Sequence, residues 1–290
     1  MSKQIILYNK LAGHGKAAVD VHEFSKRFEN PVVIDVTAEN GYSDFFEMLS
    51  EDDDIVICGG DGTLNHFVNN IHGKDIKNKV FYHAIGSGND FLRDVADVSD
   101  TFIEITKYVT DLPTVNVNGM ERVFINGIGF GIDGYCCEVG DELKEKSDKP
   151  VDYAGIAIKG LLFHFNPVNA TVTVDGVKHE FKKVWIAPAM NGRYYGGGIM
   201  PTPSQDRLNP ERKLSTLIFH GSGRLKTLMI FPKLFKGEHL AHKKHITLLE
   251  GKDIKVSFDR PCALQIDGET VKNVTEYSAT SAALVKSTDK

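Results

Sequence analysis

The sequence predicts a doubly wound, parallel α/β domain followed by a second domain made mainly of β-strands in an antiparallel, sandwich-like arrangement. From Gln4 to about Thr110, short apolar strands alternate with helical segments, and two of these strands end in glycine-rich turns. After Pro113, apolar strands follow one another with few helices between them. We therefore expect domains at 1–112 and 113–280.

The first predicted strand, Gln4–Tyr8, is followed by the polar and glycine-rich segment NKLAGHGK (9–16). Asn9 can bond to a neighbouring loop or to ribose and phosphate oxygens, and Lys16 can reach a phosphate group. A solvated lysine on a first helical turn is the alternative for Lys16. The second strand is followed by Thr37, which we expect at the same edge of the sheet.

The third predicted strand, Ile55–Cys58, ends in the turn GGDGT (59–63), and a helix follows. Glycines in this turn allow positive φ and a close approach of the backbone to a ligand. The N–H groups at the start of the helix can bind phosphate. Asp61 can hold a magnesium ion or order the loop. A plain strand-to-helix turn is the alternative interpretation.

A second turn of the same kind, GSGNDF (86–91), follows the apolar segment 80–85 and begins a helix. The carboxyl ends of parallel strands lie at one edge of a sheet, where open α/β proteins bind their ligands. We therefore expect the two turns to lie on neighbouring strands and to form one site. Asn89 and Asp90 can also act simply as helix N-caps.

Further elements are predicted from local patterns. A helix around Asp100–Val109 closes the first domain, and helical insertions at Gly134–Lys146 and Asp152–Phe165 interrupt the second. Asp175-Gly176 is typical of a hairpin with a type I′ turn. Strands of the second domain are predicted at Thr114–Asn118, Glu121–Ile128, Ala170–Val174, Phe181–Met190, Leu214–His220, His245–Leu249 and Asp253–Phe258.

The segment ALQIDGET (263–270) follows these strands and contains Asp267 and Glu269. Gly268 bends the chain so that the two carboxylates can face one side. A hairpin turn explains the segment fully, because Asp-Gly is a common turn dipeptide.

Taken in order, NKLAG, Thr37, GGDGTLN, GSGNDF and QIDGE resemble the motifs of the diacylglycerol kinase catalytic family, the bacterial lipid kinases related to sphingosine kinases. The resemblance covers nearly the whole chain. It implies transfer of the γ-phosphate of ATP, with Mg²⁺, to the hydroxyl of diacylglycerol or a related lipid alcohol. It also implies that the segment 281–290 returns to the first domain. The alternatives are a kinase for NAD or a small polyol, and a nucleotide-binding regulatory protein without catalysis.

The resemblance also implies roles for individual residues. In this family the Asp or Glu of the DGE segment takes the proton of the lipid hydroxyl, so Asp267 and Glu269 are the expected catalytic residues, with Asp267 favoured. Asp61, Asp90 and Glu269 are the expected charges for placing the catalytic Mg²⁺. Nucleotide contacts are expected from Asn9, Lys10, Leu11, Ala12, Gly13, Thr37, Gly59, Gly60, Asp61, Gly62, Thr63, Leu64, Asn65, His66, Gly86, Ser87, Gly88, Asn89 and Asp90.

One stretch departs from the family pattern. Bacterial lipid kinases often carry an acidic stretch ending in Asp-Gly-x-Leu that binds a structural magnesium, whereas this chain has Glu211-Arg212 in place of Asp-Gly. Asp206, Glu211 and the carbonyl of Lys213 are the remaining candidate ligands. In the alternative, Arg207 or Arg212 replaces the charge of the ion.

Composition is typical of a globular cytoplasmic protein. The 290 residues are 41% hydrophobic and 25% charged, with a net charge of −5. No apolar run approaches the roughly 18 residues of a membrane span, and the apolar stretch at the amino terminus is too short for a signal peptide. The four cysteines lack CxxC spacing, which indicates reduced thiols. Nucleic-acid binding is not expected from an acidic chain.

Two segments bear on the lipid substrate. Tyr153–Phe165 is apolar nearly all round, which predicts a buried helix or, alternatively, a wall of an acyl-chain pocket. Arg224–His245 contains six Lys or Arg, one Glu and three His among apolar residues. A solvated face is the ordinary interpretation of such a run, and transient contact with an anionic membrane is the alternative. Zinc binding by the histidines is a more distant one, and a homodimer is also considered.

Overall fold

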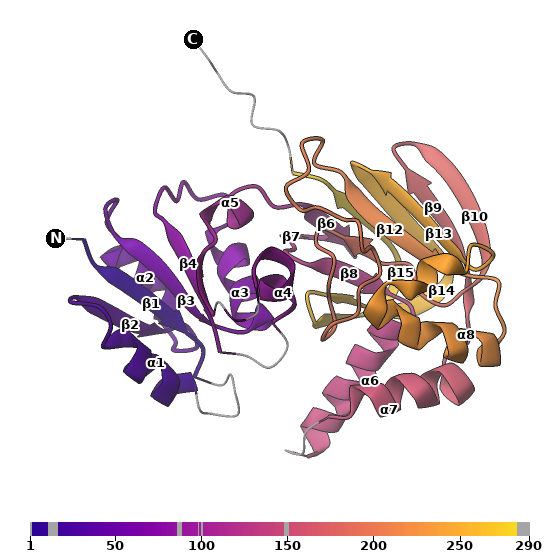
Figure 1. Cartoon of the computed structure of the whole chain (residues 1–290), viewed down its shortest axis with the longest axis horizontal. Helices are drawn as coiled ribbons and strands as arrows, with labels where there is room; N and C mark the ends of the chain where they lie inside the picture. Colours follow the sequence, from indigo (N-terminus) through magenta and orange to yellow (C-terminus); the bar gives the residue numbers. More distant parts are fainter. Residues whose placement is uncertain are drawn as a thin grey trace, which may run out of the picture. The chain divides into compact units, whose positions relative to one another are not determined.

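The computed structural model describes residues 2–10, 17–85, 89–97, 99, 101–147 and 151–282. It contains two compact units, one ending at Asp111 and the other beginning at Leu112 (Figure 1). The predicted return of the chain at 281–290 lies mostly outside the described residues and stays a prediction.

The first unit is a five-stranded sheet in the order β2-β1-β3-β4-β5. Strands β1 to β4 run parallel and β5 runs antiparallel to β4, so the predicted parallel α/β sheet is confirmed. Its elements are β1 (Gln4–Tyr8), α1 (Ala17–Ser25), β2 (Pro31–Asp35), α2 (Gly41–Met48), β3 (Asp54–Gly59), α3 (Asp61–Ile71), β4 (Val80–Ala84), α4 (Asp90–Val95), β5 (Phe102–Glu104) and α5 (Thr106–Val109).

The helix predicted around Asp100–Val109 is wrong in its first half. Residues Phe102–Glu104 form β5, and only Thr106–Val109 are helical. The strand forms because its backbone pairs with the edge of β4, with Glu104 opposite Phe81. This long-range pairing leaves no trace in the local pattern of the sequence.

Both faces of this sheet are buried. On one face Val21 and Phe24 of α1 pack against Ile6, Val56 and Cys58 of β1 and β3. The alternate residues of the same strands point to the opposite face and are buried as well. Burial on both faces explains why these strands are apolar throughout instead of alternating between apolar and polar residues.

Strands β3 and β4 are neighbours in parallel register, with Gly59 opposite Ala84. Both glycine-rich turns therefore leave the sheet at the same edge, as the sequence predicts. The register brings the start of α3 next to the start of α4.

The second unit is a ten-stranded antiparallel sheet with a helical insertion, which confirms the predicted fold class. The order of its main path is β13-β12-β11-β8-β14-β15-β6-β7, and β9 joins β14 to β10. The strands are β6 (Thr114–Val117), β7 (Met120–Val123), β8 (Gly127–Phe130), β9 (Val168–Val174), β10 (Val177–Val184), β11 (Ala189–Met190), β12 (Leu214–Phe219), β13 (Ile246–Gly251), β14 (Asp253–Ile266) and β15 (Glu269–Thr280). The helices are α6 (Ile132–Lys146), α7 (Tyr153–Lys159), the π-helix η2 (Gly160–His164), α8 (Arg224–Ile230) and the 3₁₀ helices η3 (Phe231–Lys236) and η4 (Glu238–Ala241).

Strand β14 changes partners along its length. Its first half pairs with β9 and its last residues pair with β8, with register shifts between Ser257 and Cys262. Phe130 of β8 stacks on Phe258 of β14 with ring centroids 3.8 Å apart. A bulged strand with two sets of partners bends the sheet around this core, as a sandwich-like domain requires.

Two predicted strands are broken in the structure. The segment predicted as Glu121–Ile128 is divided into β7 and β8, because residues 124–126 leave the ladder. The segment predicted as Phe181–Met190 is divided into β10 and β11. The hairpin at Asp175-Gly176 is confirmed, since both residues have positive φ (47° and 83°) as a type I′ turn requires.

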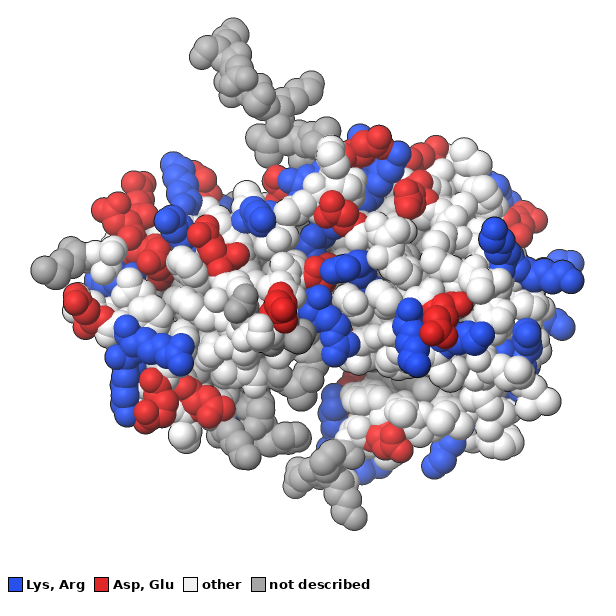
Figure 2. All heavy atoms as spheres, viewed as in Figure 1, with Lys and Arg blue, Asp and Glu red and all other residues white. Residues whose placement is uncertain are grey.

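Positive and negative side chains are interspersed over the face of the molecule shown in Figure 2. Within the described ranges, no helix combines the length and the apolar character needed to cross a bilayer.

The contact between α6 and β14 makes a testable prediction. A Cβ atom on Gly134 would lie 2.0 Å from the carbonyl oxygen of Ala263. Helix propensity alone favours alanine over glycine by about 1 kcal/mol, but the backbone of β14 cannot yield to the added methyl. We expect Gly134→Ala to lower the free energy of unfolding by about 1–3 kcal/mol, measured by urea titration.

The matched control is Gly223→Ala, because a Cβ there meets nothing within 4 Å. Stabilisation by Gly134→Ala would show that α6 does not pack against β14 as described.

Candidate functional site

Asp61 connects the two glycine-rich turns of the first unit. Its Oδ2 accepts the backbone N–H of Asp90 at 2.7 Å, and its Oδ1 accepts the N–H of Phe91 at 3.0 Å. The carboxylate thus caps the start of α4 and orders the loop, one of the two roles that the sequence leaves open. Asp90 itself is buried, with 3% of its surface exposed.

The N-terminus of α3 has the properties of a phosphate site. This helix has eleven residues, and its N-cap residue Gly60 makes no side-chain capping bond. A Cβ atom on Gly62 would meet nothing within 4 Å, so the first turn opens to space. No side chain caps this end, where the N–H groups of Thr63 and Leu64 donate to the carbonyl of Gly60 at 3.0 and 3.2 Å. The helix dipole favours an anion at this position. The residues present therefore fit a phosphate group of a nucleotide.

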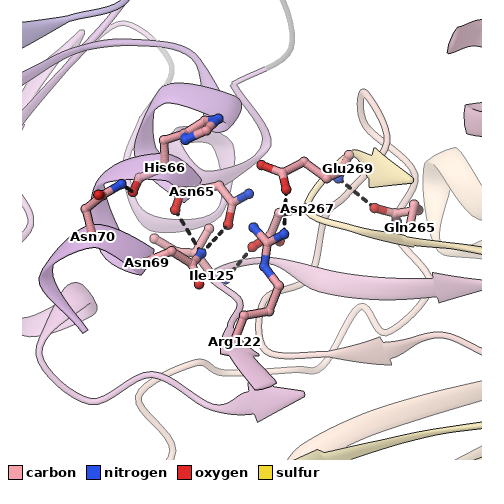
Figure 3. A network of polar contacts seen from close by, with 10 residues as sticks. Asn65, His66, Asn69, Asn70, Arg122, Ile125, Gln265, Asp267 and Glu269 are labelled. Atoms are coloured by element: carbon pink, nitrogen blue, oxygen red, sulfur yellow. Dashed lines mark hydrogen bonds and ion pairs between the residues drawn. The ribbon is translucent and has the colours of Figure 1, made fainter. Parts of the chain in front are cut away.

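Most of the other predicted residues at the end of β3 and in α3 pack within the first unit. A Cβ on Gly59 would lie 2.3 Å from Oγ1 of Thr63, so glycine is required there by packing. Asn65 is fully buried, and both its carbonyl and its side-chain oxygen accept hydrogen bonds from Asn69 at 2.9 Å (Figure 3). Leu64 is fully buried as well, whereas His66 is exposed.

Asp35 organises the predicted residues on β1 and β2, and the sequence did not single it out as a site residue. Its Oδ1 accepts the N–H and the hydroxyl of Thr37 at 3.0 and 2.6 Å, and its Oδ2 lies 3.3 Å from Lys10 Nζ. Burial raises the pKa of Asp35, but the hydrogen bonds from Thr37 and Lys10 outweigh burial and the pKa is lowered overall. A strand-terminal Asp two residues before Thr37 was the available signal.

Several predicted nucleotide contacts lie outside the described residues and stay predictions. They are Leu11, Ala12, Gly13, Gly86, Ser87 and Gly88, together with Gly15 and Lys16.

In the second unit, Asp267 holds the segment between β7 and β8. Its carboxylate accepts three backbone hydrogen bonds, from Ile125 at 2.6 Å, Asn126 at 2.8 Å and Gly127 at 2.9 Å. Figure 3 shows Asp267 beside Ile125. Asp267 has a φ of 48°, and the next N–H, of Gly268, donates to Oε1 of Gln265 at 2.7 Å. The turn that carries the DGE segment is therefore fixed on both sides.

Glu269 has a different environment. It forms an ion pair with Arg122, and its side chain remains 39% exposed (Figure 3). Asp267 is committed to three N–H groups of the protein, whereas the Glu269 carboxylate is oriented by a guanidinium and reaches solvent. The two carboxylates of the DGE segment therefore differ in their partners. Arg122 had no motif to mark it.

The residues predicted to hold a structural magnesium do not fit that ion. A carbonyl oxygen has two lone pairs, and the carbonyl of Lys213 already accepts from Gln205 Nε2 at 3.0 Å and Asn209 Nδ2 at 2.9 Å. Glu211 is ion-paired with the ammonium group of Lys213, and Asp206 Oδ1 accepts the N–H of Leu208.

The described residues contain no other cluster of metal ligands either. Over the ranges that the structure describes, no three or more His, Cys, Asp or Glu side chains are grouped so as to hold a metal ion. Of the three histidines considered for zinc, His239 is fully buried, with its Nε2 2.9 Å from the carbonyl of Pro201.

Asp133 is a buried carboxyl group that sequence reasoning missed. It is 8% exposed, and the hydroxyl of Tyr195 donates to its Oδ2 at 2.9 Å. A Cβ on Gly129 would lie 1.9 Å from the same Oδ2, so glycine makes room for the carboxyl. Burial raises the pKa of Asp133 to about 6, although the bond from Tyr195 acts in the opposite direction.

This raised pKa predicts a pH-dependent stability. The native state binds the proton of Asp133 more tightly than the unfolded state. The contribution of Asp133 to stability is therefore fully present below pH 3.8 and is lost as the pH rises to about 6. The loss reaches about 3 kcal/mol across this interval. We expect Asp133→Asn, which still accepts from Tyr195, to lack this loss. Urea titrations of both proteins between these pH values measure the difference, and parallel curves would contradict the prediction.

The helical insertion carries exposed apolar side chains in addition to buried ones. Ile156, Leu161 and Phe165 are buried, in line with the predicted core helix, but Ile158 is 49% and Phe163 71% exposed. The segment is thus half core and half surface. The predicted solvated face of Arg224–His245 likewise includes exposed apolar residues, namely Leu225, Met229 and Phe235.

Comparisons with known proteins agree with this geometry. The diacylglycerol kinase catalytic domain matches residues 3–118, and the YegS C-terminal NAD kinase beta sandwich-like domain matches residues 126–284. A crystal structure of a diacylglycerol kinase from Bacillus anthracis str. Sterne has a TM-score of 0.61 with this chain at 17% identity, covering 97% of this chain and 94% of that one. At this identity the likeness supports the fold.

Two curated relatives are similar in sequence. The diacylglycerol kinase of Mycobacterium tuberculosis is 25% identical over 254 residues, covering 83% of this chain and 80% of the relative. The diacylglycerol kinase of Bacillus subtilis (strain 168) is 24% identical over 230 residues, covering 76% of this chain and 72% of the relative. Together with the two matched domains, they confirm the predicted family. The chain therefore belongs to the diacylglycerol kinase catalytic-domain family of lipid kinases and is an enzyme of the kinase class.

Proposed function

We propose that this kinase transfers the γ-phosphate of ATP to the hydroxyl of diacylglycerol or a closely related lipid alcohol. The observation that carries the proposal is the division of roles within the DGE turn. Asp267 is held by three backbone N–H groups, whereas Glu269 is oriented by Arg122 and remains accessible. A fixed turn that presents one accessible carboxylate is what a general base for an alcohol requires.

The first unit would bind the phosphate groups of ATP. The uncapped N-terminus of α3 and the open side of Gly62 suit a phosphate, and Asp61 ties this turn to the start of α4. Mg²⁺ would enter with the nucleotide, held by its phosphate groups. When bound, Mg²⁺ spreads the negative charge that develops on the transferring phosphoryl group.

The second unit would handle the acceptor. Glu269 would accept the proton of the lipid hydroxyl as the hydroxyl oxygen bonds to the γ-phosphorus of ATP. The bond between that phosphorus and the β,γ-bridging oxygen breaks and ADP leaves, while Arg122 keeps the carboxylate in one orientation. Phosphoryl transfer requires little covalent chemistry from the protein, so the positions of these groups account for most of the catalysis.

The direct test is incubation of the purified protein with ATP, Mg²⁺ and vesicles that contain diacylglycerol, followed by mass spectrometry of the lipids. We expect a phosphatidate-like product, and we expect Glu269→Gln to lower kcat by about 10²- to 10⁴-fold because the general base is lost. The same variant should unfold at the same urea concentration as the wild type, since the side chain is 39% exposed.

The matched variant is Asp267→Asn, which replaces one acceptor oxygen by an NH₂ group facing backbone N–H groups. We expect it to lower the free energy of unfolding by about 1–3 kcal/mol.

Turnover with NAD and none with any lipid alcohol would refute the lipid assignment. Full activity of Glu269→Gln would refute the assignment of the base.

We also propose that α8 and the neighbouring η2 contact the membrane that contains the substrate. Phe163, Leu225 and Met229 are 71%, 75% and 67% exposed. The two helices lie side by side, because Arg224 Nη1 donates to the carbonyls of Leu161 and Phe165 at 2.8 and 2.9 Å. In Figure 2 this region carries both positive and negative side chains among uncharged ones.

Basic residues accompany these apolar side chains. Lys159, Lys226, Lys236, Lys243 and Lys244 are all exposed. Each lysine near an anionic leaflet contributes about 1 kcal/mol to membrane binding. The exposed apolar side chains contribute further, because inserting them into the membrane removes apolar surface from water. This combination supports reversible binding at the membrane surface.

The test is co-sedimentation with vesicles of phosphatidylcholine and phosphatidylglycerol. We expect Leu225→Gln/Met229→Gln to weaken binding by about tenfold or more, because each buried side chain is worth about 1.5 kcal/mol. Val177→Gln is the control, since Val177 is 59% exposed on β10. Equal loss in the control, or unchanged binding of the double variant, would contradict the proposal.

A further inference from the structure

Arg207 is a buried cation within the loop that departs from the family pattern. It is 6% exposed. Its Nη1 donates to the carbonyl of Ile125 at 3.0 Å, and its Nη2 donates to Oδ1 of Asn126 at 3.2 Å. A buried guanidinium is costly unless its donors are satisfied, so contacts of this kind are retained where the geometry needs them.

The partners of Arg207 are the residues that bind Asp267. The peptide group between Ile125 and Asn126 accepts from Arg207 through its carbonyl and donates to the Asp267 carboxylate through its N–H. One peptide dipole therefore links a guanidinium to a carboxylate with the correct polarity at each end. Hydrogen bonds in such a chain polarise and strengthen one another.

Side-chain amides hold the rest of the loop. Asn209 donates to the carbonyls of Asp206 and Lys213 at 2.7 and 2.9 Å, and its Oδ1 accepts the N–H of Lys213 at 2.8 Å. Gln205 donates to Lys213 at 3.0 Å and accepts from the hydroxyl of Ser215. The carbonyl positions that a metal ion would occupy are thus filled by amide donors.

Asn191 connects this loop to the same peptide. Its Nδ2 donates to the carbonyl of Ile125 at 2.9 Å, and its own carbonyl accepts from Gln205 at 3.3 Å. The segment between β7 and β8 is therefore held from the side opposite to Asp267 by two separate donors.

We infer that Arg207 is a positioning residue for the DGE turn and that this chain braces the turn with a guanidinium and amides in place of a structural metal ion. Arg207 holds the Ile125–Asn126 peptide, this peptide holds Asp267, and Asp267 fixes the turn that carries Glu269. The activity arm of the test rests on the proposed lipid kinase function. The other arms do not.

The first arm measures hydrogen exchange of the free protein in peptides that span 122–130. We expect Arg207→Ala to expose the amides of Ile125 and Asn126 to exchange at least tenfold faster, because the segment loses its support on one side. Glu211→Gln is the control from the same loop, because that side chain is 64% exposed and pairs with Lys213. It should exchange like the wild type. Unchanged protection in Arg207→Ala would overturn the inference.

The second arm measures thermal unfolding of the wild type without nucleotide, in Mg²⁺ or in a chelator. A structural ion raises the melting temperature through its binding to the native state. We expect equal melting temperatures, and a higher one in Mg²⁺ would overturn the inference. This arm needs no variant and no activity.

The third arm measures kinetics. We expect Arg207→Ala to lose about 10²-fold in kcat with little change in the KM for ATP, since a small displacement of a catalytic group has this effect. Ethylguanidinium, at concentrations far below those that denature proteins, should restore part of kcat in Arg207→Ala and none in Glu269→Gln. Failure of this rescue in a folded variant would overturn the inference.

Arg207→Lys is a second variant, which keeps the inference testable if Arg207→Ala does not fold. It keeps the charge and most of the stem but cannot span two acceptors, so we expect intermediate exchange and kcat. An inactive wild type with faster exchange in the Arg207 variants would refute the proposed function and leave the brace supported.

Discussion

The second unit depends on one carboxylate, that of Asp267, and the three backbone N–H groups that it accepts from Ile125, Asn126 and Gly127. These groups come from residues 140 to 142 positions earlier in the chain. Without the carboxylate, three N–H groups next to the sheet would lose their partners, each at a cost of about 1–3 kcal/mol. The interaction breaks the strand before β8, fixes the turn after β14 and sets the position of Glu269.

The first unit contains a similar interaction, in which an aspartate accepts backbone N–H groups from a distant segment. Asp61 lies in the GGDGT turn and spends both oxygens on the N–H groups of Asp90 and Phe91, which start the neighbouring helix α4. In each unit an aspartate beside glycine joins two segments that are distant in sequence. A carboxylate used in this way organises a site. Glu269 differs from both aspartates, because the guanidinium of Arg122 orients it.

Much of the fold could be predicted because it follows from local patterns. The alternation of apolar strands and helices predicted the parallel sheet, and Asp175-Gly176 predicted its hairpin. The predictions of secondary structure are wrong where a segment distant in sequence determines the local conformation. Phe102–Glu104 is a strand because β4 offers an edge. Residues 124–126 leave the ladder because the N–H of Phe124 donates to Pro113 and those of Ile125 and Asn126 donate to Asp267. In the loop at 205–213, the acidic residues suggested a metal, whereas Gln205 and Asn209 donate to the Lys213 carbonyl, one of the candidate ligands.

The sequence by itself determined the family, the fold class of both units, and the motif segments that supply the candidate site residues. Glycines that permit a turn and apolar residues that form a strand act over a few neighbours, so one chain segment suffices to recognise them. Only the tertiary structure decided which carboxylate is spent on the backbone and which is accessible. A hydrogen-bond partner such as Arg122 is chosen by proximity in space, and a motif carries no information about a group far away in sequence, as the Arg122–Glu269 pair at a separation of 147 residues shows.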